Sequence, residues 1–247
     1  MQINALNICS ENATLQHGVM DMIKSRLDAA LLSPVPLFSR TSETHLHRLA
    51  AAASLRTAAS RTILFAEGSR VENFYILTRG SAELFSEQDE RRFTISVLRE
   101  ARPFAVSSIF STHHSLSARI LQPSEVIGFP AKLVIELITL DPGLADAIMH
   151  ELADDAQQTI ENFKNHRLLN TTARIAHWML HSDDESGGTG QIVIPFDKRV
   201  LASYLGMTPE QLSRGFATLV PAGVTVDGRT VTISKRATLT RIAHREE

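Results

Sequence analysis

The chain has 247 residues, enough for one large or two small domains, and its 43% hydrophobic content is ordinary for a protein with a buried core. No apolar run approaches the roughly 18 residues of a membrane span, and the N-terminus lacks the basic and apolar blocks of a secretion signal, so we expect a cytoplasmic protein with no membrane partner. The single cysteine, Cys9, excludes an internal disulfide and a cysteine-ligated iron–sulfur cluster within one chain.

The net charge of −2 is unevenly spread along the chain. From Gln191 onward there are eight Lys and Arg residues against five acidic residues, a balance of +3. The preceding 190 residues carry 17 basic and 22 acidic residues, a balance of −5. A small positive module on an acidic body suits local contact with phosphate groups, whereas the overall charge argues against a protein that coats nucleic acid nonspecifically.

Residues 1–34 are predicted to be an N-terminal extension followed by a helix. Residues 1–18 are polar and aperiodic, so we expect no firm structure there. Apolar residues at helical spacing predict a helix from residue 20 to residue 32, which two prolines end. An alanine-rich pattern predicts another short helix from residue 43 to residue 53.

Residues 35–140 are predicted to form a sensor domain of short antiparallel strands. Six runs rich in β-branched and aromatic residues are separated by turn signals that contain Gly, Pro or charged residues. The runs span residues 62–65, 74–77, 82–85, 92–98, 118–121 and 125–129. Many short strands of this kind predict a closed β-roll, barrel or jelly roll.

Residues 141–169 are predicted to form one long dimerisation helix. Pro142 suits the first turn of a helix, and the helical pattern continues to about Leu169. Apolar residues recur every three or four positions, and a linking helix of this length needs a partner for such a stripe. We expect the partner to be a second copy of the chain; packing of the stripe onto the chain's own barrel is the alternative. The stripe consists of Met149, Leu152, Ala156, Ile160 and Phe163.

Residues 170–247 are predicted to form a winged helix-turn-helix domain. A helix over 173–181, a charged, glycine-rich loop over 182–190 and a strand over 192–194 precede two short amphipathic helices. Gly206 ends the first of these helices, and Thr208-Pro209 opens the second. A hairpin over 225–233, with the favoured turn pair Asp227-Gly228, forms the wing.

The second short helix presents a polar face suited to a DNA major groove. Leu212, Phe216 and Leu219 form its buried side, and this division between an anchored and an exposed face is what a recognition helix needs. Arg214 is suited to donate to O6 and N7 of guanine, and Glu210 to accept from the amino group of cytosine. The predicted base-reading residues are Glu210, Gln211, Ser213 and Arg214, and the predicted phosphate contacts are Lys198, Arg199, Thr208 and Arg229. Gly215 lies within the same helix, where it costs about 1 kcal/mol relative to alanine.

From about residue 35 to residue 240, the chain resembles the CRP/FNR superfamily of bacterial transcription regulators. The motifs that carry the resemblance are Phe65-Ala-Glu-Gly68, Phe74-Tyr-Ile-Leu-Thr-Arg-Gly80, Val193-Ile-Pro195, Leu201-Ala-Ser-Tyr-Leu-Gly206 and Thr208-Pro-Glu-Gln-Leu-Ser-Arg214. The resemblance implies an α+β fold with a β-roll sensor, a long dimerisation helix and a winged helix-turn-helix. In the FNR-like branch, Glu, Ser and Arg at the spacing of Glu210, Ser213 and Arg214 read half-sites related to TTGAT in an inverted repeat.

The resemblance also bears on the effector. Members that bind cyclic AMP hold its phosphate with a Gly-Glu pair and a later Arg-Ser pair, and the corresponding positions here are Ala105-Val106 and Leu116-Ser117. A buried phosphodiester without a cation carries a large desolvation cost, so we expect no cyclic nucleotide. The expected pocket is apolar and is formed, with the long helix, by Phe104, Val106, Ile109, Phe110 and Leu116.

Such a pocket suits an aromatic acid, another small hydrophobic effector or a haem that senses a diatomic gas. The neighbouring His113 and His114 are candidate haem ligands, because a neutral imidazole ligates haem iron; the alternative is a pair of solvent-exposed loop histidines. The sequence does not choose among these effectors.

These features predict a homodimeric transcription regulator rather than an enzyme. Its expected partners are double-stranded DNA, a second copy of the chain, RNA polymerase and a small effector that shifts the population of DNA-binding states. Two alternatives remain open at this point. The helix-turn-helix could mediate protein contacts in a ligand-binding or scaffold module, or the protein could bind DNA without an effector.

Overall fold

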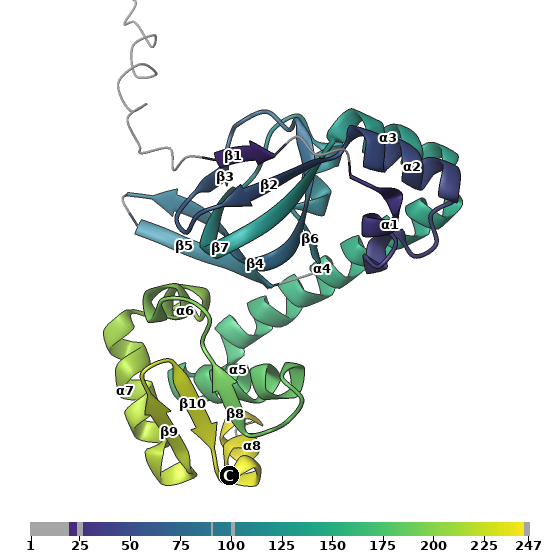
Figure 1. Cartoon of the computed structure of the whole chain (residues 1–247). Helices are drawn as coiled ribbons and strands as arrows, with labels where there is room; N and C mark the ends of the chain where they lie inside the picture. Colours follow the sequence, from purple (N-terminus) through teal and green to yellow (C-terminus); the bar gives the residue numbers. More distant parts are fainter. Residues whose placement is uncertain (1–19, 24–26, 90, 100–101, 245–247) are drawn as a thin grey trace, which may run out of the picture.

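The computed structural model describes residues 20–23, 27–89, 91–99 and 102–244, which form a β-roll and a winged helix-turn-helix joined by one long helix (Figure 1). This is the α+β architecture that the sequence predicts. The predicted unstructured segment 1–18 lies outside the described residues.

The β-roll contains most of the strands, and its helices lie at one end. Its strands are β1 (Met20–Ile23), β2 (Ser54–Ala58), β3 (Ile63–Phe65), β4 (Asn73–Gln88), β5 (Arg91–Arg99), β6 (Arg102–Phe104) and β7 (Ser117–Pro130). Its helices are α1 (Ala29–Leu32), the 3-10 helix η1 (Pro36–Phe38), α2 (Glu43–Ala52), the 3-10 helix η2 (Val106–Phe110) and α3 (Ala131–Leu140).

All strands of the roll belong to one antiparallel sheet. Within the described residues the order is β1-β2-β7-β4-β5, with β3 paired to β7 and β6 paired to β4. The two long strands β4 and β7 pair along most of their length. Ala82 and Leu84 of β4 point into the aromatic and aliphatic interior of the roll, so that Glu83 and Phe85 lie on the opposite face.

The sequence predicted four strands where the structure has the two long strands β4 and β7. The apparent turn at Gly80 is a register irregularity within β4, because the pairing with β7 shifts between Leu77 and Ala82. Gly80 has a φ of 99°, and a Cβ there would lie 2.1 Å from Oγ of Ser124 on β7. The glycine therefore permits a close approach of two strands.

Among the described residues, the predicted helix over 20–32 is wrong at residues 20–23 and is found only at residues 29–32. Residues 20–23 form β1, which pairs with β2 from Met20–Ala58 to Ile23–Leu55. The helix α1 covers only residues 29–32, because the carboxylate of Asp28 caps it by accepting a hydrogen bond from the Ala30 amide at 3.2 Å. The predicted helix over 43–53 is confirmed as α2.

The long helix α4 (Pro142–Leu168) confirms the predicted helix and starts at a buried carboxylate. Asp141 is 4% exposed and accepts hydrogen bonds from the Leu144 amide, the Ser42 amide, the Ser42 hydroxyl and Nδ1 of His45, at 2.8–3.0 Å. Burial alone would raise the pKa of Asp141, but these hydrogen bonds outweigh it and hold the pKa well below its ordinary value. Asp141 thereby fixes the start of α4 against the N-terminus of α2.

The C-terminal domain consists of a small sheet with helices packed around it. Its elements are α5 (Thr171–Glu185), β8 (Gln191–Val193), α6 (Lys198–Tyr204), α7 (Pro209–Leu219), the 3-10 helix η3 (Val220–Ala222), β9 (Val224–Asp227), β10 (Thr230–Ile233) and α8 (Arg236–His244). The sheet order is β8-β10-β9, and Gly228 and Arg229 join β9 to β10. The first residues of the predicted loop 182–190 continue α5, where Asp183 is 1% exposed, accepts from the Gly190 amide and pairs with Arg236 of α8.

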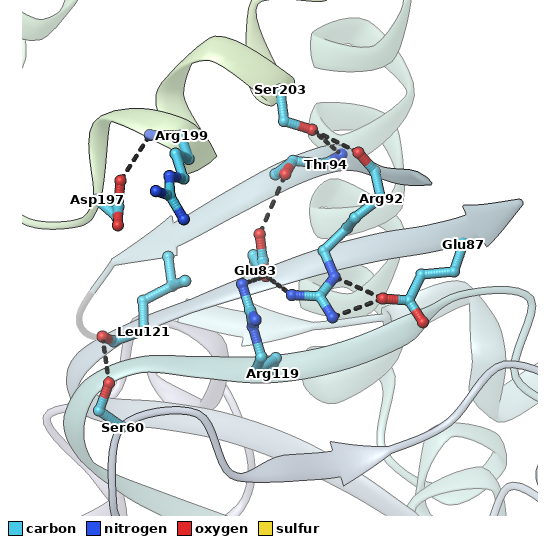
Figure 2. Close-up of polar contacts among 10 residues, drawn as sticks. All are labelled: Ser60, Glu83, Glu87, Arg92, Thr94, Arg119, Leu121, Asp197, Arg199 and Ser203. Atoms are coloured by element: carbon cyan, nitrogen blue, oxygen red, sulfur yellow. Dashed lines mark hydrogen bonds and ion pairs between the residues drawn. The ribbon is translucent and has the colours of Figure 1, made fainter. Parts of the chain in front are cut away.

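The β-roll and the C-terminal domain touch where α6 meets the edge strand β5 (Figure 2). The Ser203 hydroxyl accepts a hydrogen bond from the Thr94 amide at 2.8 Å and donates one to the Arg92 carbonyl at 3.0 Å. One α6 side chain thus satisfies two backbone groups on the edge of the sheet.

Candidate nucleic-acid interface

The two short helices α6 and α7 form a helix-turn-helix whose ends are defined by local contacts. Asp197 caps α6, accepting from the Arg199 amide at 2.7 Å, and Gly206 turns the chain with a φ of 63°. Thr208 caps α7 by accepting from the Gln211 amide at 3.3 Å, and the Gln211 side chain accepts from the Thr208 amide at 2.9 Å. These contacts fix where α7 begins.

The two faces of α7 are divided as the sequence predicts. Leu212, Phe216 and Leu219 are 1%, 7% and 0% exposed and join the core of the C-terminal domain. Glu210, Ser213 and Arg214 are exposed on the opposite face. The structure therefore brings these three predicted base-reading residues together on one accessible surface.

The charges of this face are available for hydrogen bonding. A hydrogen bond with Thr208 lowers the pKa of Glu210, and the nearby charge of Arg214 lowers it further. Glu210 is therefore an ionised acceptor at neutral pH. Within the described residues, no hydrogen bond holds the guanidinium of Arg214. This face thus presents an acceptor beside a donor that is suited to bidentate contacts.

The side chain of Gln211 is committed to the cap of α7. Its amide oxygen accepts from the Thr208 backbone at the helix start, although the residue itself is exposed. Sequence reasoning placed Gln211 among the base-reading residues and missed this contact. The signal was present, because Thr208 and Gln211 have the Thr-X-X-Gln spacing of a capping box.

The four predicted phosphate contacts do not lie together. Nζ of Lys198 lies 5.9 Å from the ring centre of Phe216, and Nε of Arg229 donates to the Ile194 carbonyl at 2.7 Å. The Thr208 hydroxyl caps α7, and Arg199 lines the space between α6 and the β-roll sheet. Lys198 and Arg229 border the helix-turn-helix and wing, whereas Arg199 faces the sensor domain in this arrangement.

At Gly215, α7 lies close against α5. A Cβ at this position would lie 2.2 Å from Cδ1 of Ile175, which is fully buried. From the sequence alone, Gly215 was expected to destabilise the helix through its low helix propensity. The propensity cost remains, but the structure adds a role for the glycine, because the missing side chain lets α7 pack directly on α5.

The apolar stripe of α4 does not pack onto the chain's own β-roll beyond its first half. Leu144 and Ile148 are buried in the core that α4 shares with α3, and Leu152 is half-buried against that core. Met149, in the first half of the helix, is nevertheless 62% exposed; beyond Leu152, Ala156 is exposed, and Ile160 and Phe163 are 54% and 61% exposed. A row of exposed apolar side chains on one long helix is typical of a helix that meets a partner.

The five residues predicted to line one effector pocket are split between different surroundings. Phe104 and Leu116 pack in the interior of the roll, whereas Val106 and Ile109 pack in the core beneath α2, α3 and α4. Phe110 is 55% exposed. The five residues thus lie in two cores and at the surface, because the chain passes from one core to the other between Phe104 of β6 and Val106 of η2.

His113 and His114 have opposite environments. His113 is exposed, and its Nδ1 lies 2.9 Å from the Thr112 hydroxyl. His114 is 4% exposed and stacks on Phe65, with ring centres 3.8 Å apart. Burial lowers the pKa of His114, and its Nδ1 has no hydrogen-bond partner among the described residues. The alternative of two solvent-exposed histidines is thus wrong for His114.

The surroundings of His114 do not fit a haem. Phe65, Tyr75 and Phe104 stack on one another in the interior of the roll with ring centres 5.7–6.2 Å apart. A haem needs a wide, flat cavity beside its imidazole ligand, and these rings fill the space against which His114 packs.

Residues that sequence reasoning missed lie on the outer face of the sheet. Glu83 is fully buried and forms ion pairs with Arg119 and, at 3.8 Å, with Arg92. The run Ala82-Glu-Leu-Phe85 carries no local signal of these partners, because Arg92 and Arg119 lie on the other strands β5 and β7.

Comparisons with known proteins agree with this geometry. Residues 55–141 match the family described as cyclic nucleotide-binding domain, and residues 173–242 match the Crp-like helix-turn-helix domain; together they cover more than half of the chain. The chain belongs to the CRP/FNR superfamily of transcription regulators. This regulator is 26% identical over 166 residues to a probable transcriptional activator of Rhizobium leguminosarum bv. viciae, covering 65% of the chain and 68% of that protein.

Solved structures show the same fold. FixK2 from Bradyrhizobium japonicum superposes with a TM-score of 0.71 at 18% identity, covering 77% of this regulator and 96% of FixK2. The c-di-GMP responsive global regulator CLP of Xanthomonas campestris superposes with a TM-score of 0.67 at 18% identity, covering 78% of this regulator and 99% of CLP. In the described part of the regulator, no helix is both long and apolar enough to cross a membrane.

Proposed function

We propose that this regulator binds DNA as a homodimer, with α7 of each subunit in the major groove of one half of an inverted repeat related to TTGAT. The observation that carries the proposal is the exposed face of α7, on which Glu210, Ser213 and Arg214 stand together above a buried underside. Arg214 reads O6 and N7 of guanine, and Glu210 accepts from the amino group of cytosine. Lys198 and Arg229 contact the flanking phosphates.

The dimer forms along α4. An inverted repeat has a two-fold axis, and a two-fold dimer sets its recognition helices about 34 Å apart, one helical turn of DNA. The exposed apolar side chains Met149, Ala156, Ile160 and Phe163 support α4 as the contact, because pairing with a second α4 removes them from water.

A small effector other than a cyclic nucleotide controls the affinity for DNA. Leu116 and the fully buried Val106 offer no charge for a cyclic phosphate. The unpaired Nδ1 of His114 among aromatic rings supports an aromatic acid or a related small molecule as the effector. The effector acts by binding one arrangement of the domains more tightly than the other, and DNA-bound dimers then contact RNA polymerase.

A mobility-shift assay tests the DNA proposal. Wild-type protein, Arg214→Ala and Arg241→Ala are titrated onto a TTGAT inverted repeat and onto a scrambled duplex at moderate salt. Arg241 is a matched control, because it is an exposed arginine of the same domain on α8. We expect wild type and Arg241→Ala to prefer the repeat and Arg214→Ala to lose the preference. Equal binding of both duplexes by wild type contradicts the proposal, and no binding of either duplex supports a protein-contact module instead.

Two inexpensive measurements test the effector. The absorption spectrum of freshly purified protein should lack a Soret band, and a Soret band would contradict the packing around His114. A thermal-shift screen with aromatic acids should raise the unfolding temperature of wild type but not of His114→Phe, which keeps the stack on Phe65 and removes the nitrogen.

A further inference from the structure

A cavity of about 550 Å³ lies between the outer face of the β-roll sheet and α6. Its charged lining residues are Arg61, Glu83, Arg92, Arg119, Asp197 and Arg199. In Figure 2 the Arg199 side chain extends from α6 toward the sheet that carries Arg119. The cavity is on the opposite face of β4 from the aromatic interior of the roll, so it is separate from the proposed effector site near His114.

The cavity lining carries four arginines against two carboxylates, and the carboxylates are already engaged. Glu83 is paired with Arg119 and Arg92, and Arg92 also donates from Nε to Glu87 at 2.9 Å. Asp197 accepts the Arg199 amide in the cap of α6. The positive charge of this cavity therefore exceeds the negative charge that the chain supplies.

Three arginines have donors to spare. Within the described residues, the guanidinium groups of Arg61 and Arg199 make no hydrogen bond or ion pair, and the buried Nε of Arg119 has no hydrogen-bond partner. Burial lowers the pKa of Arg119 more than the neighbouring Glu83 carboxylate raises it. A guanidinium that is largely buried and has an unpaired N–H is stabilised by a further anion.

We propose that this cavity binds a small phosphate-bearing anion, which Arg61 and Arg119 hold from the β-roll and Arg199 holds from α6. Guanidinium groups match phosphate oxygens with paired hydrogen bonds, and the cavity has the volume of a typical small-ligand site. The anion bridges the two domains at the contact where Ser203 joins α6 to β5, and it therefore stabilises the docked arrangement of the helix-turn-helix.

Isothermal titration calorimetry of the full chain with inorganic pyrophosphate, at constant ionic strength, tests the site. We expect wild type to bind pyrophosphate. Arg199→Gln and Arg61→Asn should each bind it at least about tenfold more weakly. Asn is chosen at position 61 because it tolerates the positive φ of 73° there. Arg241→Gln, outside the cavity, should bind like wild type. Absence of binding by wild type at millimolar pyrophosphate, or an equal loss in Arg241→Gln, overturns the proposal.

Citrate and hydrogen exchange complete the test. Citrate serves as an anion that carries carboxylates and no phosphate. If citrate binds as tightly as pyrophosphate, the assignment of the cavity to a phosphate-bearing anion is overturned. Pyrophosphate should also slow hydrogen exchange at the Thr94 amide, which donates to Ser203 across the domain contact, and unchanged exchange at saturating pyrophosphate contradicts a bridging site. None of these measurements contains DNA, so their failure is distinct from failure of the proposed DNA site.

Discussion

Replacing Gly215 with alanine is expected to destabilise the C-terminal domain, although alanine is the better helix former. A Cβ at position 215 would lie 2.2 Å from Cδ1 of Ile175, whereas ordinary contacts begin at 3.4 Å. The two atoms must therefore separate by more than about 1 Å, in a core where side chains are close-packed. Ile175 is fully buried, so its displacement also disturbs its neighbours.

The magnitude follows from two opposing terms. Alanine gains about 1 kcal/mol of helix propensity over glycine, whereas overpacking a core costs about 1–3 kcal/mol. We expect Gly215→Ala to lower the free energy of unfolding by up to about 2 kcal/mol. In an Ile175→Val background the clashing Cδ1 is absent, and the same substitution should then raise the free energy of unfolding by up to about 1 kcal/mol.

Urea unfolding followed by the fluorescence of Trp178 measures these changes. Trp178 is the single tryptophan and lies in the core of the C-terminal domain. Ala217→Gly, on the exposed face of α7, is the control and should cost about 1 kcal/mol from propensity alone. The close-approach explanation is refuted if Gly215→Ala stabilises the wild-type background, or if its effect is the same with Ile and Val at position 175.

Three further substitutions test contacts elsewhere in the chain. The folded-state pKa of Asp141 lies below its unfolded value of about 3.9, so its stabilisation is present above that pH and is lost as the pH falls. Asp141→Asn should lower the free energy of unfolding by about 1–3 kcal/mol at pH 7 and flatten the acid-side slope of thermal stability. Asp146→Asn, at a half-exposed carboxylate paired with Arg40 on the surface, should leave that slope in place. Phe163→Glu should weaken dimerisation at least about tenfold in analytical ultracentrifugation with unchanged circular dichroism; an undiminished dimer contradicts pairing through α4. Ser203→Ala should speed hydrogen exchange at the Thr94 amide by about tenfold, and unchanged exchange would show that α6 does not protect β5.

The helix-turn-helix could be predicted from the sequence because its determinants are local. The Thr208 cap, the Gly206 turn and the spacing of Leu212 and Phe216 all lie within one short segment, and together they fix which side chains of α7 are exposed. The exposure of Arg214 follows from the same periodicity.

The errors arose where a distant segment decides the structure. Gly80 reads locally as a turn, and only the approach of Ser124 on β7 makes it an irregularity within one strand. Residues 20–23 are extended because β2 pairs with them. His114 is buried against Phe65, and Glu83 is buried with Arg92 and Arg119 of other strands, so no residue next to either one in the sequence indicates its burial.

The contact between Arg214 and guanine provides the most direct test of base reading by α7. Fluorescence anisotropy compares wild type and Arg214→Ala on the TTGAT inverted repeat and on the repeat with guanine replaced by adenine in both halves. We expect wild type to favour guanine by about 1–3 kcal/mol per half-site and Arg214→Ala to bind both duplexes equally. An Arg214→Ala variant that retains the full preference for guanine would contradict base reading by this face of α7.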